Sequence, residues 1–181
     1  THYKSDQIKK HFGSGERWGI KIHYIEEPEP LGTAGVLTLL PDDLPDIPII
    51  VMNGDVLSNI DFLNMLQFHY STKSDCTIAV KEIQRRLPYG VVDTKDSQVT
   101  RIVEKPVHSH FINAGIYVIN KSRIDMFRKS QFLEMPDLLT SLIERKNKVS
   151  AFAIHEYWLD IGRPSDYEKA NADIDAILGE R

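Results

Sequence analysis

The sequence predicts an α/β fold in which helices flank a mostly parallel sheet and one small antiparallel hairpin is added. Predicted strands and helices alternate through the first half of the chain, the order typical of parallel strands joined by helical crossovers. Residues 49–52 are continuously apolar, as expected of a strand buried on both faces of a parallel sheet. Residues 90–93 and 99–104 flank the turn 95–97, which predicts the hairpin.

The other elements follow from periodicity, capping residues and helix breakers. Ser5 and Thr33 are expected to cap helices, Gly13 to end the first helix, and Pro136 and Pro164 to open helices. The sequence contains no repeat, low-complexity tract or linker, so a single domain over residues 1–181 is the simplest interpretation. The expected helices cover residues 5–13, 36–40, 61–70, 136–145 and 164–178, and the remaining expected strands cover 21–25, 76–80, 112–119, 149–154 and 157–160.

Composition excludes several classes of protein. The chain has 22 Lys and Arg against 26 Asp and Glu, so its net charge is −4, and it shows no basic surface for nucleic acid or anionic membranes. No apolar run approaches the ~20 residues of a membrane span. Cys76 is the only cysteine, so an intrachain disulfide and a paired-cysteine metal site are excluded. With no signal peptide visible at the polar start, these features predict a cytoplasmic location.

Two carboxylates follow predicted strands directly. Asp55 comes after the apolar run, preceded by Asn53 and Gly54, and Asp160 comes after an apolar strand. Ligands of open α/β sheets bind beyond the carboxyl ends of strands, and Gly54 lets a ligand approach the backbone closely. Alone, each is better explained as an ordinary turn. Together they suggest a Mg²⁺ site, because like charges within about 4–6 Å repel and a divalent cation removes that cost.

Glu104 and Lys105 end another predicted strand. Pro106 is expected to hold Lys105 in extended geometry, so that its amine leaves the sheet in a defined direction toward a phosphate. Glu104 could accept hydrogen bonds from sugar hydroxyls. Adjacent strand residues face opposite sides, so both side chains reach one site only if the strand bends there. The alternative is a solvated charged pair.

Small residues mark three further segments. Residues 31–35 stand at a helix entrance, where free amides suit an anion or a base edge. Gly90, which follows Tyr89, and Gly115 would let a flat sugar ring lie against the backbone, with Asn113 bonding its hydroxyls. The alternative for each segment is a simple turn or strand. Familiar phosphate-loop and metalloprotease motifs are absent, and the closely spaced His108 and His110 are attributed to chance in a loop.

In order and spacing, these segments resemble the sugar-1-phosphate nucleotidyltransferases, also called nucleoside-diphosphate-sugar pyrophosphorylases, from residue 1 to about residue 171. Residues 155–163 are most similar to the branch resembling mannose-1-phosphate guanylyltransferases. The segments are Glu26-Glu27 through Leu31-Gly32-Thr33-Ala34-Gly35, Asn53-Gly54-Asp55, Pro88-Tyr89-Gly90-Val91-Val92, Glu104-Lys105-Pro106, Asn113-Ala114-Gly115-Ile116-Tyr117 and Trp158-Leu159-Asp160-Ile161-Gly162.

The resemblance implies a Rossmann-like sheet and a Mg²⁺-dependent reaction, in which a sugar 1-phosphate takes the nucleotidyl group of an NTP, expected to be GTP, and pyrophosphate leaves. Catalysis would rest on positioning and charge neutralisation. By resemblance Asp55 and Asp160 hold the metal and Lys105 binds the sugar phosphate. The implied substrate-binding set is Leu31 and Gly32 by the base and ribose, Glu104, Asn113 and Gly90 at the sugar, and Thr33, Gly54, Tyr89 and Gly115 beside them.

The sequence departs from the family at its start. Members begin with a strand and a glycine-rich loop, carrying an Arg and a Lys, that wraps the triphosphate, and nothing here matches it. Residues 1–3 align with the end of the family's second strand, so the chain is expected to be a nucleotidyltransferase domain that lacks its first strand. We therefore expect little or no transferase activity from the chain alone. The apolar surface left open could be covered by a second copy, so a homo-oligomer is left open.

Two other functions are weighed against the enzyme. One is a non-catalytic sugar-nucleotide-binding or scaffolding protein of the same fold. The other is a metal-dependent glycosyltransferase, which is disfavoured because that class usually holds its metal on D-x-D, whereas residues 53–55 read Asn-Gly-Asp. Release of pyrophosphate from an NTP and a sugar 1-phosphate would distinguish the nucleotidyltransferase from both alternatives.

Overall fold

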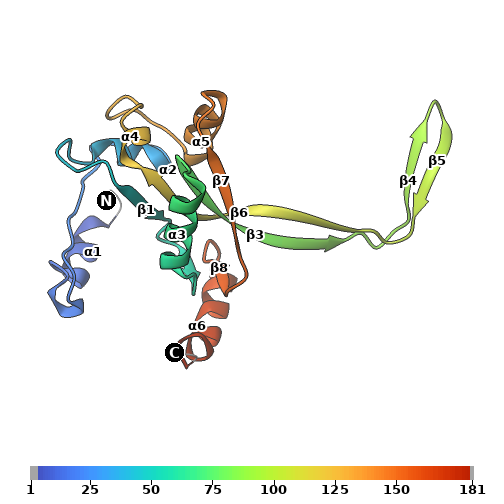
Figure 1. The fold of residues 1–181 in the computed structure, drawn as a ribbon. Coiled ribbons are helices and arrows are strands. Elements are labelled where there is room, and N and C mark those ends of the chain that lie inside the picture. The colour runs from blue at the N-terminus through green and yellow to red at the C-terminus, as the bar shows by residue number, and fades with distance from the viewer. Residues whose placement is uncertain (1–3, 180–181) are drawn as a thin grey trace.

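The computed structural model describes residues 4–179 and places side chains up to residue 174 (Figure 1). No helix among these residues is long and apolar enough to cross a membrane. The helices are α1 (Ser5–Phe12), η1 (Glu16–Trp18), α2 (Gly32–Gly35), η2 (Val36–Leu39), α3 (Phe62–Thr72), α4 (Lys121–Ile124), α5 (Met135–Glu144) and α6 (Pro164–Gly179). The strands are β1 (Pro48–Met52), β2 (Val56–Ser58), β3 (Cys76–Arg86), β4 (Val91–Lys95), β5 (Gln98–Val103), β6 (Val107–Asn120), β7 (Val149–Ile154) and β8 (Trp158–Asp160).

The central sheet has four strands in the order β1-β6-β3-β7. Strand β6 is antiparallel to both of its neighbours, whereas β3 and β7 are parallel. Strands β1, β3 and β7 therefore run in one direction and β6 alone is reversed. The α/β class is confirmed, with a mixed sheet in which only one hydrogen-bonded pair is parallel. The cause is the connection into β6, which arrives from a hairpin and not through a helical crossover.

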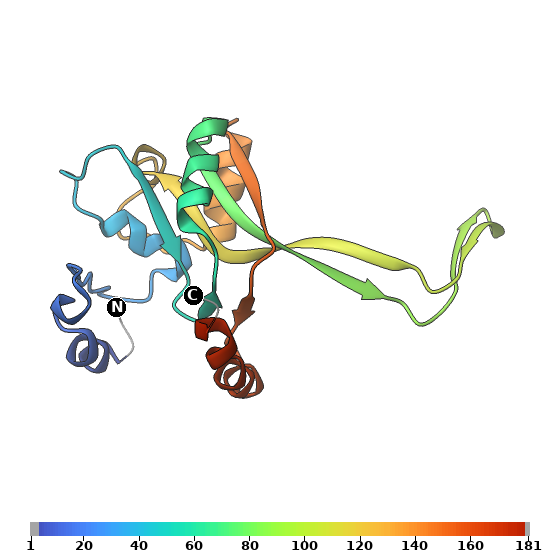
Figure 2. The same ribbon diagram turned by 60° about the horizontal axis from the view of Figure 1, so that its bottom comes forward.

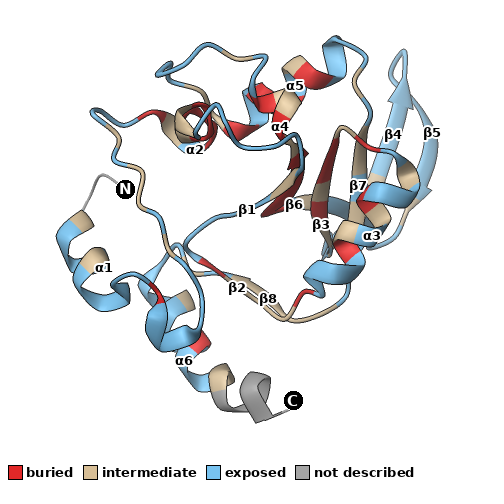
Figure 3. Cartoon of the chain, turned by 60° about the vertical axis from the view of Figure 1, so that its left-hand side comes forward, coloured by how far each residue is buried: buried red, intermediate tan, exposed pale blue. Residues whose placement is uncertain are grey.

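The hydrophobic core lies on both faces of β6, whose buried residues form a continuous run in Figure 3. Tyr117 and Ile119 pack with α2, η2, α4 and α5, whereas Ile116 and Val118 pack on the other face with α3. Figure 2 shows α3 and α5 on opposite sides of the sheet. This alternation follows from the two-residue period of a strand. Residues 49–52 were expected to have this burial, but β1 is an edge strand, so its Ile50 remains 41% exposed.

Strands β3 and β6 continue past the sheet as a two-stranded arm, here defined as residues 81–112, with the β4–β5 hairpin at its far end (Figures 1 and 2). The hairpin was predicted correctly. The arm was missed, because the sequence indicated strands only over 76–80 and 112–119. Residues 81–86 and 107–111 show no clear apolar alternation, since no second layer covers them. His108 and His110, expected in a loop, lie on β6 with ring centroids 6.4 Å apart.

Several local predictions hold and others fail. Asp61 caps α3, accepting from the Asn64 amide at 3.0 Å, and Pro136 stands in the first turn of α5. Ser5 is not the cap, since Lys4 takes the N-cap position of α1, and no side-chain hydrogen bond caps this helix. Residues 21–25 form no strand, because no neighbouring strand pairs with them. Thr33 lies inside α2, and residues 36–39 are a 3₁₀-helix where an α-helix was expected.

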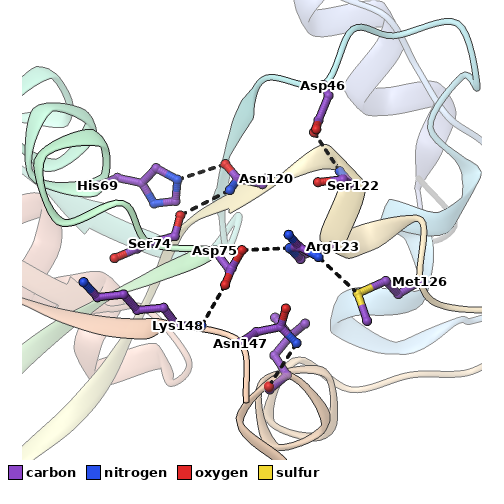
Figure 4. A network of polar contacts seen from close by, with 11 residues as sticks. Asp46, His69, Ser74, Asp75, Asn120, Ser122, Arg123, Met126, Asn147 and Lys148 are labelled. Atoms are coloured by element: carbon purple, nitrogen blue, oxygen red, sulfur yellow. Dashed lines mark hydrogen bonds and ion pairs between the residues drawn. The ribbon is translucent and has the colours of Figure 1, made fainter. Parts of the chain in front are cut away.

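Polar contacts fasten the sheet at the end where β1, β3 and β7 begin (Figure 4). The buried His69 ring bonds Thr77 Oγ1 at 2.9 Å and Asn120 Oδ1 at 3.0 Å. Asp75 accepts from Arg123 Nε at 2.8 Å and from the Lys148 backbone amide at 2.7 Å. These bonds connect α3, α4 and the turn before β7 to the sheet, and a pocket of about 340 Å³ lies beside them, lined in part by His69, Asp75 and Asn120. The opposite end, where β1 finishes, is the edge at which ligands of α/β sheets bind.

Candidate active site

The two predicted metal-binding acids lie on one short ribbon. Strands β2 and β8 pair antiparallel, with Val56 opposite Asp160. The amide of Ile161 donates to the carbonyl of Asp55 at 2.8 Å. The backbones of Asp55 and Asp160 are therefore neighbours, and both residues are exposed. Residues far apart in the sequence meet here because β2 follows β1 directly and β8 follows β7.

A pocket of about 110 Å³ opens where the β2–β8 ribbon meets β6. It stands at the carboxyl end of β1, the edge at which α/β sheets bind ligands. Its volume is below the ~300–1,000 Å³ of a typical ligand site, so it fits part of a nucleotide sugar. Its lining residues are Asn53, Val56, Asn113, Ala114, Gly115, Tyr117, Trp158 and Asp160.

The amide of Asn113 is held in one orientation. Its Nδ2 donates to Tyr117 Oη at 2.8 Å and its Oδ1 accepts from the Gly115 amide at 3.0 Å. One Nδ2 hydrogen is left to meet a ligand oxygen. Burial raises the pKa of Tyr117, so the phenol stays neutral and keeps its own proton to donate. The fixed Asn113 side chain can therefore donate one hydrogen bond to a ligand hydroxyl oxygen, as its predicted contact to a sugar requires.

Gly115 is required by the shape of the site. Its φ of 70° is a left-handed conformation that side chains disfavour, and a Cβ would stand 2.8 Å from Asn53 Nδ2. The backbone amide of Asn53 donates to the Gly115 carbonyl at 2.9 Å. The glycine therefore lets the end of β1 lie directly against β6.

The segment at residues 31–35 does not offer the free amides that the sequence suggested. The amides of Ala34 and Gly35 donate to Leu133 O at 2.9 Å and 3.0 Å, and the Thr33 amide donates to Glu134 Oε2 at 3.2 Å. Hydrogen bonds from Thr33 lower the pKa of that carboxyl. Leu31 is buried. These amides are used to hold α2 against the segment that enters α5, so a base or ribose would meet Gly32 and the surface beside it.

At the far end of the arm, the predicted sugar-phosphate residues gather at a bend. Lys105 has a φ of 45°, so the extended geometry expected before Pro106 is wrong. The chain must turn here from β5 into β6, and the Lys105 amide donates to Tyr89 O at 3.2 Å. Lys105 Nζ stands 3.8 Å from Glu104 Oε1, and a Cβ on Gly90 would stand 3.0 Å from Glu104 Oε2. The bend that lets Glu104 and Lys105 share one side is thus present.

The arm separates this second cluster from the acids. At about 3.3 Å per residue, β6 spans roughly 20 Å between Val107 and Asn113. Figures 1 and 2 both show the hairpin far from the β2–β8 ribbon. The structure therefore gathers Asp160, Asn113 and Gly115 around one pocket, with the backbone of Asp55 beside that of Asp160, and separately gathers Tyr89, Gly90, Glu104 and Lys105. Lys105 and the two acids, to which the resemblance assigns one reaction, therefore do not meet in one hollow of this structure (Figures 1 and 2).

Sequence reasoning gave no role to five residues that line the pocket, which are Asn53, Val56, Ala114, Tyr117 and Trp158. Asn53 and Trp158 belong to segments singled out for the acids, and their own side chains were given no role. Tyr117 lies two and four residues beyond Gly115 and Asn113 on β6, so the period of a strand could have found it. Trp158 Nε1 donates to Ala114 O at 2.8 Å.

Comparison with known proteins identifies the family. The profile of the family described as Nucleotidyl transferase matches residues 1–176, so the chain belongs to this family. It is 36% identical over 176 residues to D-glycero-alpha-D-manno-heptose 1-phosphate guanylyltransferase of Aneurinibacillus thermoaerophilus, covering 96% of this chain and 76% of that protein. It is 40% identical over 157 residues to probable mannose-1-phosphate guanylyltransferase 1 of Oryza sativa subsp. japonica, covering 82% of this chain and 43% of that protein.

Solved structures agree with this assignment. HddC from Yersinia pseudotuberculosis superposes with a TM-score of 0.70 at 30% identity, covering 96% of this chain and 76% of that chain. The same protein has been solved in complex with GMP-PN. The chain spans half or less of several mannose-1-phosphate guanylyltransferases, including 50% of the one from Mycobacterium tuberculosis. The resemblance seen in the sequence motifs is confirmed at the level of the family and the fold.

Proposed function

We propose that this chain takes part in transferring a guanylyl group from GTP to a sugar 1-phosphate. The observation that carries the proposal is the β2–β8 pairing, which brings the backbones of Asp55 and Asp160 together at the carboxyl end of β1, where Asp160 lines the same pocket as Asn113. The names of the relatives supply the base and the reaction.

In the proposed reaction a phosphate oxygen of the sugar 1-phosphate forms a bond to the α-phosphorus of GTP. The bond between that phosphorus and the oxygen bridging to the β-phosphate breaks, and pyrophosphate leaves with the electron pair. No proton must move to a side chain, so the protein contributes mainly by positioning and by neutralising charge. Asn113 would orient the sugar through its remaining amide hydrogen, and Gly115 keeps the pocket open for the sugar ring.

The residues present fit a magnesium ion. Mg²⁺ is commonly held by one or two carboxylates, with water and substrate phosphates completing its octahedron. Asp55 and Asp160 supply two hard oxygen donors, and the described residues contain no larger cluster of His, Cys, Asp and Glu that could bind a metal without phosphate. We propose that these two acids hold Mg²⁺, which as a Lewis acid would neutralise charge on the phosphates.

Residues on the arm would complete the sugar-phosphate site. Lys105 is half exposed, so its amine is free to meet a phosphate. We propose that Lys105 binds the sugar phosphate with Glu104, Tyr89 and Gly90 beside it, and that Leu31, Gly32, Thr33 and Gly54 lie along the nucleotide. Since the two clusters are separated along the arm, this role requires the arm to approach the body when substrate is bound.

Substitution of the acids tests the proposal. Asp55→Asn and Asp160→Asn should each weaken Mg²⁺-dependent binding of a GDP-sugar at least tenfold, since each removes a charged oxygen donor. Isothermal titration with and without Mg²⁺ measures this effect. Asp43→Asn, an exposed acid in the loop before β1, is the matched control and should bind like the parent. Equal binding by all the variants, or binding indifferent to Mg²⁺, would contradict the metal site.

Turnover separates the enzyme from the alternative of a non-catalytic binding protein. We expect the chain alone to release little or no pyrophosphate from GTP and mannose 1-phosphate, since no segment of residues 1–181 matches the glycine-rich, basic loop that the family resemblance places around the triphosphate. Release at the rate of an intact relative would contradict this expectation. Binding without turnover, in a longer form of the protein as well, would favour the non-catalytic role.

Two further predictions concern the setting of the protein. Strand β1 leaves one edge unpaired and exposes Ile50 and Met52, so we propose that a second copy covers this edge. Sedimentation of the chain as a clean monomer would contradict it. We also propose a cytoplasmic location, where nucleoside triphosphate is available and the buried, free Cys76 stays reduced.

A further inference from the structure

The ribbon that carries both acids is not part of the central sheet. Strands β2 and β8 form a separate two-stranded sheet, so no continuous ladder fixes their place relative to β6. An isolated two-stranded ribbon is only marginally stable in water. Its position therefore depends on individual contacts where it meets the central sheet.

Those contacts gather at an irregularity in β6. The β3–β6 pairing shifts register between Ile78 and Val80, and Ala114 and Gly115 have no partner in the register of either neighbouring strand. Their carbonyls are available to other donors because the ladder is interrupted. Bulges of this kind are common beside active sites, where they redirect side chains.

Both carbonyls are taken by the segments that hold the acids. Gly115 O accepts from the Asn53 amide at 2.9 Å, and Ala114 O accepts from Trp158 Nε1 at 2.8 Å. Ala114 is fully buried, so its carbonyl would lose its partner if the indole were removed. Trp158 is two residues before Asp160, and Ala114 lies between Asn113 and Gly115.

We propose that Trp158 is a positioning residue that sets the place of Asp160 relative to Asn113 through its indole N–H. The inference rests on the proposed function, because it assigns a purpose to the distance between the metal-binding acid and the sugar-binding amide. Lys81 provides a separate tether before β8, donating to His155 O at 3.1 Å and Glu156 O at 2.8 Å. The Lys81 tether holds the turn that leads into β8, whereas the indole holds the strand beside the pocket.

A purely structural role for Trp158 makes a different prediction. Its ring packs with Val56 and Ile60 in the cluster under α3, so it also fills space in the core. If filling space were the only contribution of Trp158, Trp158→Phe would have the same effects on hydrogen exchange and ligand binding as the loss of another aromatic ring from that cluster. Phe152→Leu provides the matched control, because Phe152 packs on the same cluster and contacts the Phe68 ring at a tilt of 60° but donates no hydrogen bond to β6.

Hydrogen exchange tests the tether without any ligand. In Trp158→Phe, we expect the Asn53 amide to exchange about fivefold to tenfold faster, because the ribbon loses one of its hydrogen bonds to β6. Amides of the regular β3–β6 ladder, such as Val118, should be unchanged. Phe152→Leu should leave the Asn53 amide at the parental rate. Equal acceleration of both amides, or of neither, would overturn the proposal.

Ligand binding then tests the purpose of the tether. Trp158→Phe should weaken Mg²⁺-dependent binding of a GDP-sugar about tenfold, with a smaller loss for GDP alone, and Phe152→Leu should change neither. A loosened ribbon with unchanged binding would overturn the positioning role. Parental chain that binds no GDP-sugar at all would overturn the proposed function and the positioning role with it, while the exchange result would still report on the tether.

Trp158 fluorescence provides an independent readout. In Trp18→Phe the remaining indole is Trp158, because the chain has two tryptophans and Trp18 lies outside the pocket. We expect addition of a GDP-sugar with Mg²⁺ to shift the emission of this variant. Unchanged emission under conditions where titration shows binding would place the ligand away from Trp158 and contradict the proposal.

Discussion

The body of the molecule and its arm are made from the same two strands but are stabilised differently. In the body, β6 is buried from Ala114 to Ile119 because helices cover both faces of the sheet. In the arm, the same strand is exposed from Val107 to Phe111, and β3 likewise becomes exposed toward Arg86. Burial of a strand thus depends on the layers around it. The stability of the protein is expected to lie in the body, while the arm can move without cost to the core.

The candidate site stands where these two regions join. Asn113 and Gly115 lie on β6 immediately after its arm segment, and the irregular pairing at Ile78 and Val80 lies beside them. The arm carries Lys105 at its other end. A joint at the pocket would let an arm movement bring that lysine toward the phosphates. The following experiments test whether body and arm are as independent as this comparison implies.

The largest effect should come from emptying the core. Ile116→Ala removes a fully buried side chain and should lower the free energy of unfolding by about 3 kcal/mol. Phe111→Ala, five residues away on the same strand and 65% exposed, is the matched arm variant and should change it by no more than about 0.5 kcal/mol. Urea denaturation measures both values. Similar losses would mean that the arm is buried in solution.

A substitution at the joint should have an intermediate effect. Gly115→Ala forces a side chain into a φ of 70° and against Asn53, so it should cost roughly 1–2 kcal/mol and weaken GDP-sugar binding. Gly19→Ala is the control, since its φ of 68° carries similar strain but a Cβ there meets nothing within 4 Å, so GDP-sugar binding should be unchanged. Thermal denaturation and titration measure the pair. Parental stability and binding in Gly115→Ala would show that β1 does not need to contact β6 this closely.

Removal of the arm tip should leave the body almost unchanged. Replacing residues 87–106 with Asn-Gly should alter the free energy of unfolding by less than about 1 kcal/mol, because the β4–β5 hairpin has no buried core. Binding of mannose 1-phosphate should be lost, since Tyr89, Gly90, Glu104 and Lys105 are removed. Chemical denaturation and titration test the two statements separately, and a large loss of stability would contradict the independence of the arm.

The smallest effect on stability is expected for Lys105→Ala. Its ion pair with Glu104 is 3.8 Å long and exposed, so the free energy of unfolding should not change measurably. Binding of sugar 1-phosphate should weaken more than binding of free GTP. Lys95→Ala, an exposed lysine of β4, is the control and should affect neither ligand. Equal losses for both ligands in Lys105→Ala would contradict its assignment to the sugar phosphate.

Much of the fold was accessible from local signals. Asp61 at the start of α3 and Pro136 at the start of α5 marked those helices, and the turn at Asp96 and Ser97 marked the hairpin. The segments around Asp55 and Asp160 carried the family resemblance. These features are readable because caps, prolines and turns act on neighbours within a few residues.

Other features depend on partners that are distant in the sequence. Nothing in residues 49–52 indicates that β1 is an edge strand, and nothing near Thr33 shows that Leu133 and Glu134 occupy the amides of α2. The arm could not be predicted from hydrophobic periodicity, because its two strands pair with each other but pack no apolar face against another layer. The register shift beside Ala114 arises from pairing between strands that meet only in the folded chain. The same is true of the Trp158 indole, which donates to the Ala114 carbonyl there.

The amino-acid order alone therefore predicted the family and the α/β class correctly and indicated Asp55 and Asp160 as candidate metal ligands, since these signals lie in short, local segments. The folded structure alone shows which strand is buried by helices, which backbone amides are hydrogen-bonded within the protein, and that Lys105 lies far from Asp160. Those properties depend on contacts between segments that are distant in the sequence. Such contacts form only in the folded chain, where apolar side chains are packed and buried backbone groups are hydrogen-bonded at the same time.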